Sequence, residues 1–162
     1  MNRPFDHCTG CGAALPQESW PARCEECGKT HFLNPLPVSV LLQPTDEGVV
    51  TIRRDIEPRR GELALPGGFI DLGESWQEAG VRELYEETGI VVDPAEVKLF
   101  DVLSAPDGTV LIFGEAPPVR VDDLPAFVPS EEVSERVLVP DRRELAFPLH
   151  TEMLEKWHLR KA

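Results

Sequence analysis

Three glutamates stand within five consecutive positions of this chain, at Glu83, Glu86 and Glu87. Like charges at helical spacing repel each other, so folding alone gives no reason to gather them. On a helix that advances ~100° per residue, the three carboxylates fall within an arc of about 100°. A solvated helix face is one explanation. Trp76 and Leu84 lie on or beside the same face, which favours a site for a hard cation, Mg2+ or Mn2+, at a core boundary.

The four cysteines form a second group with metal-binding chemistry. They occur as two C-x2-C pairs, Cys8/Cys11 and Cys24/Cys27, and each pair is followed by a glycine. Two such turns can direct four sulfurs to one centre, which suits structural Zn2+. A redox dithiol, two disulfides and structural thiols are the alternatives, but a redox pair does not explain the second C-x2-C. We therefore predict a closed zinc site without a catalytic position.

The chain is predicted to contain two domains, a zinc ribbon at residues 1–35 and a larger domain at residues 36–162. A segment as short as the first cannot bury enough surface to fold unaided, so the metal replaces a core. Asn34–Pro37 is predicted as the linker. His7 and His31 could be substitute zinc ligands, although surface or packing roles are the favoured interpretation.

The bulk composition excludes several classes of protein. The 162 residues are 41% hydrophobic and 28% charged, with a net charge of −13. That charge repels a phosphate backbone and argues against extended nucleic acid, but not against a small anion held by metal ions. No apolar run approaches the ~20 residues of a membrane helix, and the first residues lack a signal core. We therefore expect a cytoplasmic protein that binds no membrane.

The remaining pattern indicates a mixed α/β fold. Ser75 is a suitable N-cap, Glu78 completes a capping box, and Gly89 is a natural residue after the helix end. Strands are expected at 38–42, 49–53, 63–65, 97–103, 109–114 and 136–139, a long loop at 122–135 and a last helix at about 149–159. The first two strands are predicted to form a hairpin. Gly67 and Gly68 are expected to turn the chain and bring bare backbone close to a ligand.

The acidic helix and its flanking glycines match the pattern G-x5-E-x7-R-E-U-x-E-E-x-G-U, where U is apolar. The matching residues are Gly68, Glu74, Arg82, Glu83, Leu84, Glu86, Glu87, Gly89 and Ile90. This pattern is the Nudix box, and every specified position is filled. The chain therefore resembles the Nudix hydrolase family, and its cysteine segment makes it similar to the zinc-ribbon-containing members.

The resemblance implies an α/β/α sandwich around a mixed sheet, and it implies roles for individual residues. Glu83, Glu86 and Glu87 would bind catalytic Mg2+ or Mn2+, with the Gly67 carbonyl as a further ligand. Arg82 would pair with a glutamate of the box.

Further roles follow from the same resemblance. Glu74 would lie near the metal cluster. The general base varies within the family, and a glutamate of the box, Glu115, Glu132 and Glu135 all stay open.

Candidate substrate contacts are Arg54, Gly68 and Phe69. For Arg54 a solvated rim is the competing explanation, and for Phe69 it is core packing. Core packing is also favoured for the other phenylalanines that could stack on a base, which are Phe100, Phe113 and Phe127.

The resemblance implies hydrolysis of the pyrophosphate in a nucleoside diphosphate-linked compound. The whole chain, including Glu144–Pro148, is similar to zinc-ribbon enzymes that cleave FAD or ADP-ribose and release AMP. Activity on NADH or NAD is an alternative, although Val102–Gly108 lacks the Ser-Gln-Pro-Trp element usual in those enzymes. A ligand-sensing module without catalysis is the second alternative, and the intact carboxylate set argues against it. Many relatives are dimers, so a homodimer is possible by resemblance.

Overall fold

The computed structural model describes residues 6–16 and 20–161. The predicted ribbon segment 1–35 is thus described except at 1–5 and 17–19, and the segment 36–162 except at its last residue.

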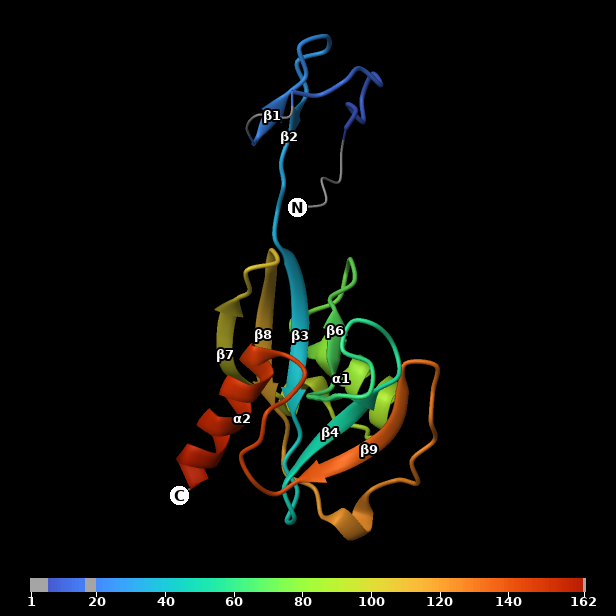
Figure 1. The fold of residues 1–162 in the computed structure, drawn as a ribbon, viewed down its shortest axis with the longest axis vertical. Helices are drawn as coiled ribbons and strands as arrows, with labels where there is room; N and C mark the ends of the chain where they lie inside the picture. Colours follow the sequence, from blue (N-terminus) through green and yellow to red (C-terminus); the bar gives the residue numbers. More distant parts are fainter. Residues whose placement is uncertain (1–5, 17–19, 162) are drawn as a thin grey trace.

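A four-stranded mixed sheet forms the centre of the larger part of the chain (Figure 1). Its strand order is β6-β3-β8-β7, and the strands are β3 (Leu36–Leu42), β6 (Gly67–Phe69), β7 (Lys98–Ser104) and β8 (Thr109–Glu115). Strand β3 runs parallel to β8 and antiparallel to β6, while β7 is antiparallel to β8. The predicted mixed sheet is therefore confirmed. Gly67–Phe69, expected as a turn, instead continues as strand β6.

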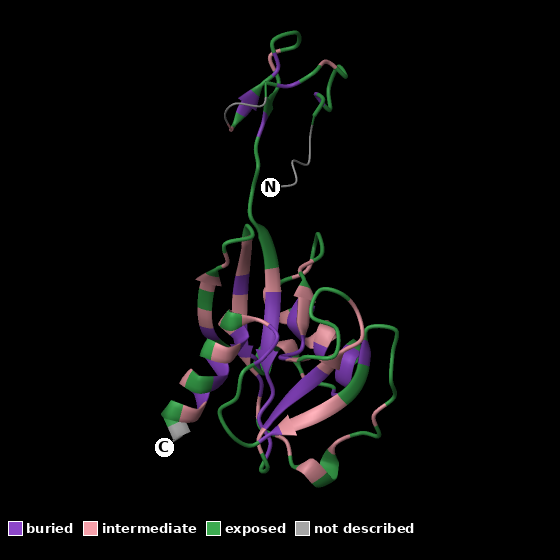
Figure 2. Ribbon diagram, viewed as in Figure 1, coloured by how far each residue is buried: buried purple, intermediate pink, exposed green. Residues whose placement is uncertain are grey.

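One helix covers each face of this sheet. Successive residues of a strand point to opposite faces. Leu41 packs with Leu84 of helix α1 (Trp76–Thr88), whereas Val40 packs with Met153 and Leu154 of helix α2 (Pro148–Lys161). The expected α/β/α arrangement follows from this alternation. Figure 2 shows the buried residues concentrated along the central strands between the helices.

A second, three-stranded sheet has the order β5-β4-β9 and is antiparallel. Its strands are β4 (Val49–Arg54), β5 (Leu63–Ala64) and β9 (Val133–Val139). The predicted hairpin between the first two strands of the domain is wrong. Both edges of β3 are occupied by β6 and β8, so β4 pairs elsewhere and only the bridge Pro44↔Val49 remains at the turn. The predicted loop at 122–135 is also too long, because β9 begins at Val133.

Helix α1 begins and ends as predicted. The Ser75 hydroxyl accepts a hydrogen bond from the Glu78 backbone N–H, and the Glu78 carboxylate accepts from the Ser75 N–H. Gly89 ends the helix with a φ of 77°, which a side chain would disfavour. Between these caps, a Cβ on Gly80 would lie 2.7 Å from the Ser39 hydroxyl on β3. The missing side chain lets the helix approach the sheet closely.

The described N-terminal residues form a small separate unit that an extended segment joins to β3 (Figure 1). Its two strands, β1 (Ala22–Arg23) and β2 (Thr30–His31), pair antiparallel. Two short 3-10 helices, η1 (Pro94–Glu96) and η2 (Val121–Asp123), complete the elements of the described chain. Among the described residues, no helix has the length and apolar character needed to cross a membrane.

Candidate active site

The three clustered glutamates of α1 line one cavity of about 320 Å³. The cavity walls are made by Glu83, Glu86, Glu87, Ser130, Glu131 and Glu132. Glu87 is the most buried of the helix carboxylates, at 8% exposed. The structure therefore places an acidic face against a second acidic segment, the loop that precedes β9. Repulsion on this scale needs counter-charge.

Strand β6 meets the cavity with bare backbone. The Gly67 N–H donates to Glu87 Oε2 at 2.9 Å. A Cβ on Gly67 would lie 2.3 Å from the Ser39 carbonyl oxygen, and a Cβ on Gly68 would lie 2.4 Å from Glu83 Oε1. Both positions thus require glycine, because any side chain would displace either β3 or a carboxylate of the cavity.

Arg82 holds the carboxylates of the box in place. Its Nε and Nη2 donate to the two oxygens of Glu74 at 2.8 and 3.0 Å. Its Nη1 donates to Glu83 Oε1 at 2.7 Å, and Nη2 also reaches the Phe69 carbonyl at 3.0 Å. Bidentate pairing fixes orientation as well as charge. Arg82 therefore connects α1, β6 and the loop between them.

The carboxylates around Arg82 differ in proton affinity. Burial raises the pKa of Glu87 to about 8, and the neighbouring charges of Glu83 and Glu132 act in the same direction. Burial also raises the pKa of Glu83. The hydrogen bonds from Arg82 lower the pKa of Glu74. Perturbed carboxylates in a cleft are typical of functional sites.

The three glutamates outside the box lie in different surroundings. Glu132 lines the cavity, as does its neighbour Glu131. Glu115 instead accepts a hydrogen bond from Trp157 Nε1 of α2 at 2.9 Å. Glu135 pairs with Arg53 at 2.7 Å. Only Glu132, of the three, faces the box carboxylates.

The candidate substrate contacts lie near the cavity but not in its walls. Arg54 donates through Nε to the Pro58 carbonyl at 2.9 Å, and its guanidinium lies 5.1 Å from the centre of the Phe147 ring. Phe69 is 56% exposed on β6. Phe100 and Phe113 are buried in the core, as core packing requires.

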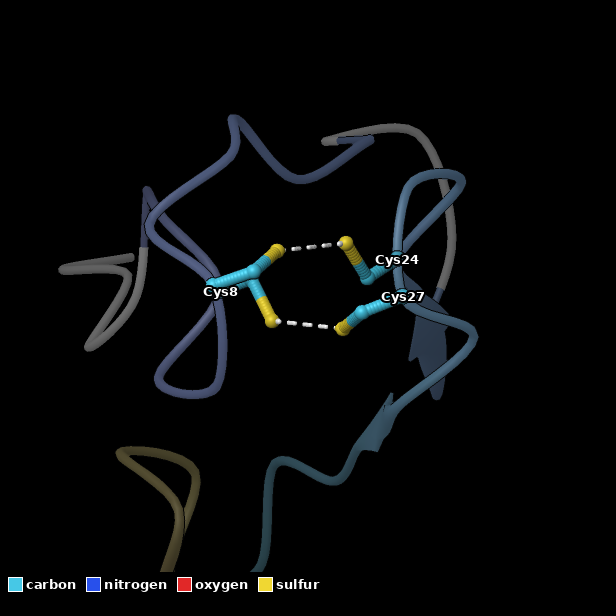
Figure 3. Close-up of side chains that lie close together, drawn as sticks. Cys8, Cys24 and Cys27 are labelled. Atoms are coloured by element: carbon cyan, nitrogen blue, oxygen red, sulfur yellow. Dashed lines mark hydrogen bonds between the residues drawn. The ribbon is translucent and has the colours of Figure 1, made fainter.

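The four cysteine sulfurs meet at one point. Figure 3 shows Cys8 on one loop facing Cys24 and Cys27 on the other. All four Sγ atoms lie within 4.8 Å of one another, with 3.5 Å between Cys8 and Cys27 and 3.6 Å between Cys11 and Cys24. A tetrahedron of thiolates around zinc has edges of ~3.8 Å, given Zn–S bonds of ~2.3 Å. The residues therefore fit a four-thiolate zinc ion.

The surroundings act differently on Cys8 and Cys11: hydrogen bonds from neighbouring thiols raise the pKa of Cys11 to about 12, whereas the thiolate form of Cys8 is favoured. The backbone N–H of Gly10 is the main cause that lowers the pKa of Cys8 to about 5. His31 Nε2 lies 3.3 Å from Cys8 Sγ. The four grouped ligand atoms are all cysteine sulfurs, so His31 contacts this cluster from outside it.

The acidic cavity also suits divalent cations, on the chemistry of its donors. Hard cations take carboxylate and carbonyl oxygens, and this cavity offers five carboxylates beside a glycine backbone. Ser130 and Glu131 were not predicted as wall residues. The long acidic loop was visible in the sequence, but only the pairing of β4 with β9 brings its end to α1.

Comparison with known proteins assigns the family. Residues 33–158 match the NUDIX domain family, so the chain belongs to it. The match includes the two larger sheets, helix α1, most of helix α2 and the acidic cavity.

Two curated relatives are similar over different parts of the chain. An ADP-ribose pyrophosphatase of Methanocaldococcus jannaschii is 45% identical over 62 residues, covering 38% of this chain and 36% of that protein. A NAD-capped RNA hydrolase, NudC, of Enterobacter sp. is 25% identical over 154 residues, covering 84% and 59%. The chain thus spans between about a third and three-fifths of the length of these relatives.

A solved structure shares the fold over nearly the whole chain. A NUDIX hydrolase from Nitrosomonas europaea superposes with a TM-score of 0.73 at 22% identity, covering 97% of this chain and 92% of that one.

Proposed function

We propose that this protein is a metal-dependent hydrolase that cleaves the diphosphate of a nucleoside diphosphate-linked compound of the ADP-ribose or FAD type and releases AMP. The observation that carries the proposal is the cavity in which the clustered glutamates of α1 face Glu132. A domain used only for sensing does not need this complete set of carboxylates. The named ADP-ribose activity of the Methanocaldococcus relative supports the substrate class.

In the proposed mechanism, Glu83, Glu86 and Glu87 would hold Mg2+ or Mn2+ together with the Gly67 carbonyl. Bound divalent cations supply neutralisation of the diphosphate charge and a lower pKa for the attacking water. Arg82 keeps Glu83 oriented through its pairing with Glu74 on the opposite side.

We further infer that Glu132 accepts the proton of the attacking water. It is the one glutamate of the three outside candidates that lines the cavity, and its charge acts on both Glu83 and Glu87. Addition of water across one P–O bond of the diphosphate then yields AMP and the phosphorylated remainder. A general base must lie within reach of the water in the substrate complex.

Domain organisation and the ribbon metal belong to the same proposal. Residues 1–35 would form a ribbon with one structural zinc held by the cysteine sulfurs, which already meet at tetrahedral spacing. Residues 36–162 would form the hydrolase domain. Arg54 and Phe69 would contact the substrate from the rim of the cavity.

NAD or NADH is a second candidate substrate class. The similarity to the NudC relative extends over 84% of the chain and supports it. The net charge of −13 disfavours an attached RNA strand.

A substrate panel tests the proposal. The purified chain is incubated with Mg2+ or Mn2+ and with FAD, ADP-ribose, NADH, NAD, dinucleoside polyphosphates or nucleoside triphosphates, and the products are separated by chromatography. We expect AMP from ADP-ribose or FAD well above the others. NADH or NAD as the preferred compound would support the second candidate, and no release from any compound would favour a sensing module.

A further inference from the structure

His150 is a buried titratable residue outside the Nudix box. It lies in the first turn of α2 and is 6% exposed. Its ring packs against Phe113 and Phe147, with ring centres 5.8 and 5.1 Å away. A buried imidazole is costly unless its nitrogens are used. The structure shows how one of them is used.

The Leu65 backbone N–H donates to Nδ1 of His150 at 3.2 Å. Because a backbone N–H can only donate, Nδ1 must be the acceptor and carry no proton. The neutral ring then carries its proton on Nε2. Leu65 is itself buried and stands two residues before Gly67, whose backbone borders the acidic cavity.

The segment from Leu65 to Gly67 is held from three elements. His150 of α2 accepts from Leu65, and the Leu41 N–H of β3 donates to the Pro66 carbonyl at 2.9 Å. The Gly67 N–H donates to Glu87 of α1. Pro66 has no N–H and is held through its carbonyl, so each of the three successive residues makes one of these hydrogen bonds. Loss of any one frees part of this backbone.

The residues just before α2 also bond to the chain just before Leu65. The Ala146 N–H donates to the Leu63 carbonyl at 2.7 Å. Ala146 stands two residues before α2, so this bond holds β5 beside the start of the helix that carries His150. No described residue of α2 lines the acidic cavity, so α2 reaches the site indirectly, and the bond from Leu65 to His150 is one such contact.

We propose that His150 is a positioning residue for the metal site: its Nδ1 holds the backbone of Leu65–Gly67 so that Gly67 meets Glu87 and presents its carbonyl to the cavity. This inference rests on the proposed function, because it takes Gly67 and Glu87 as cation ligands. His150 does not touch the reacting atoms and is not a catalytic residue.

Three full-length variants test the inference. His150→Leu removes the acceptor but keeps an apolar side chain, and His150→Asn places an amide oxygen near the position of Nδ1. His158→Leu is the matched control, since His158 lies on the same helix and its buried Nε2 has no hydrogen-bond partner among the described residues. Dissociation constants for Mn2+ are measured by calorimetry, alongside kcat and KM.

We expect His150→Leu to weaken Mn2+ binding by about tenfold or more, as the loss of a group that orients metal ligands does. The asparagine variant should recover most of this loss, and His158→Leu should bind Mn2+ like the unaltered protein. The effect should appear in kcat and metal affinity, not in KM for the nucleotide. Equal Mn2+ affinity in His150→Leu, or no recovery with asparagine, would overturn the inference.

A measurement on the unaltered protein guards against a variant that fails to fold. Nitrogen NMR of the His150 ring should show an unprotonated Nδ1 and a protonated Nε2 at neutral pH, and the Leu65 amide should exchange slowly. A protonated Nδ1 would refute the inference without any mutation. If instead the chain hydrolyses nothing while these ring and amide signals hold, the proposed function fails and the hydrogen bond stands.

Discussion

Glu74 and Glu87 show how the same side chain acquires opposite properties within one site. Glu74 receives two hydrogen bonds from Arg82, which lower its pKa. Glu87 is buried beside other carboxylates, so its pKa rises to about 8. Desolvation and like charge act together on Glu87, and opposite charge dominates at Glu74. Arg82 therefore stabilises the ionised form of Glu74 on one side of the acidic cluster. The charge on the Glu87 side is left for cations to neutralise.

At the residue scale, Glu132→Gln tests the proposed base. The change removes the proton acceptor and should lower kcat by about 10² to 10⁴-fold. Glu131→Gln is the matched comparison, because it removes a neighbouring charge from the same cavity wall. We expect a much smaller loss there. Equal losses in steady-state rates would mean that Glu132 acts through charge alone.

His150 gives a second prediction, on stability against pH. Burial, and then the charge of Arg54, lower its pKa from 6.5 to about 3 in the folded protein. Below pH 6.5 the unfolded chain binds a proton at this histidine and the folded chain does not. The contribution of His150 to the free energy of unfolding is therefore complete above pH 6.5 and is lost as the pH falls toward 3. In this window, each unit of pH changes the free energy of unfolding by about 1.4 kcal/mol.

Urea unfolding of the unaltered chain and of His150→Asn measures this contribution. Between pH 7 and pH 5, the unaltered chain should lose about 2 kcal/mol more unfolding free energy than the variant. Other titrating groups are common to both proteins and cancel in the difference. Parallel pH profiles would show that the imidazole is not held neutral by the fold.

At the element scale, α1 depends on its capping box. Ser75→Ala removes the hydroxyl that accepts from the Glu78 N–H, and should lower the free energy of unfolding by about 1 kcal/mol. Ser104→Ala changes an exposed serine on β7 and is the control. Denaturant titration of both variants provides the comparison. A loss no larger than that of the control would show that the Ser75 hydroxyl does not stabilise α1.

The elements with strong local signals could be predicted from the sequence, and pairing between distant segments could not. Helix α1 carries its own caps, and the box fixes the spacing of its carboxylates. By contrast, the predicted hairpin failed because β3 pairs with the distant strand β8 instead of its neighbour β4. Turn residues at Gln43–Gly48 do not reveal which sheet the next strand joins.

The same limit applies to the site. Spacing in the sequence could not separate the roles of Glu115, Glu132 and Glu135. Their positions depend on how β8 and β9 pair with distant strands, and the sequence does not show that pairing. His150 gave no signal at all, since one buried histidine on an amphipathic helix is ordinary in a core. Its meaning comes from the contact with Leu65.

At the scale of the whole molecule, the proposed ribbon and the proposed hydrolase domain differ in what can stabilise them. The described N-terminal unit buries few apolar residues, namely Cys8, Leu15, Ala22 and Cys24, whereas the larger part has two helices packed on a sheet. We therefore expect a metal to replace the core in this unit.

Elemental analysis should find one zinc per chain, and Cys24→Ser should lose it. Because the hydrolase domain has its own core, we expect the variant to keep the far-ultraviolet circular dichroism of that domain while the ribbon loses protection from proteolysis. Cys24 is buried within the ribbon, so the effect should stay local. A folded, protease-resistant ribbon without zinc would contradict the structural-metal assignment.

The most direct test of the central claim compares the unaltered chain with Glu86→Gln/Glu87→Gln on the preferred substrate, over a titration of Mg2+. The double variant removes two carboxylates from the cavity and keeps their shape. Removal of ligand charge should lower the rate at least about a hundredfold, while circular dichroism and zinc content stay unchanged. Turnover close to that of the unaltered chain would contradict the assignment of this cavity as the catalytic site.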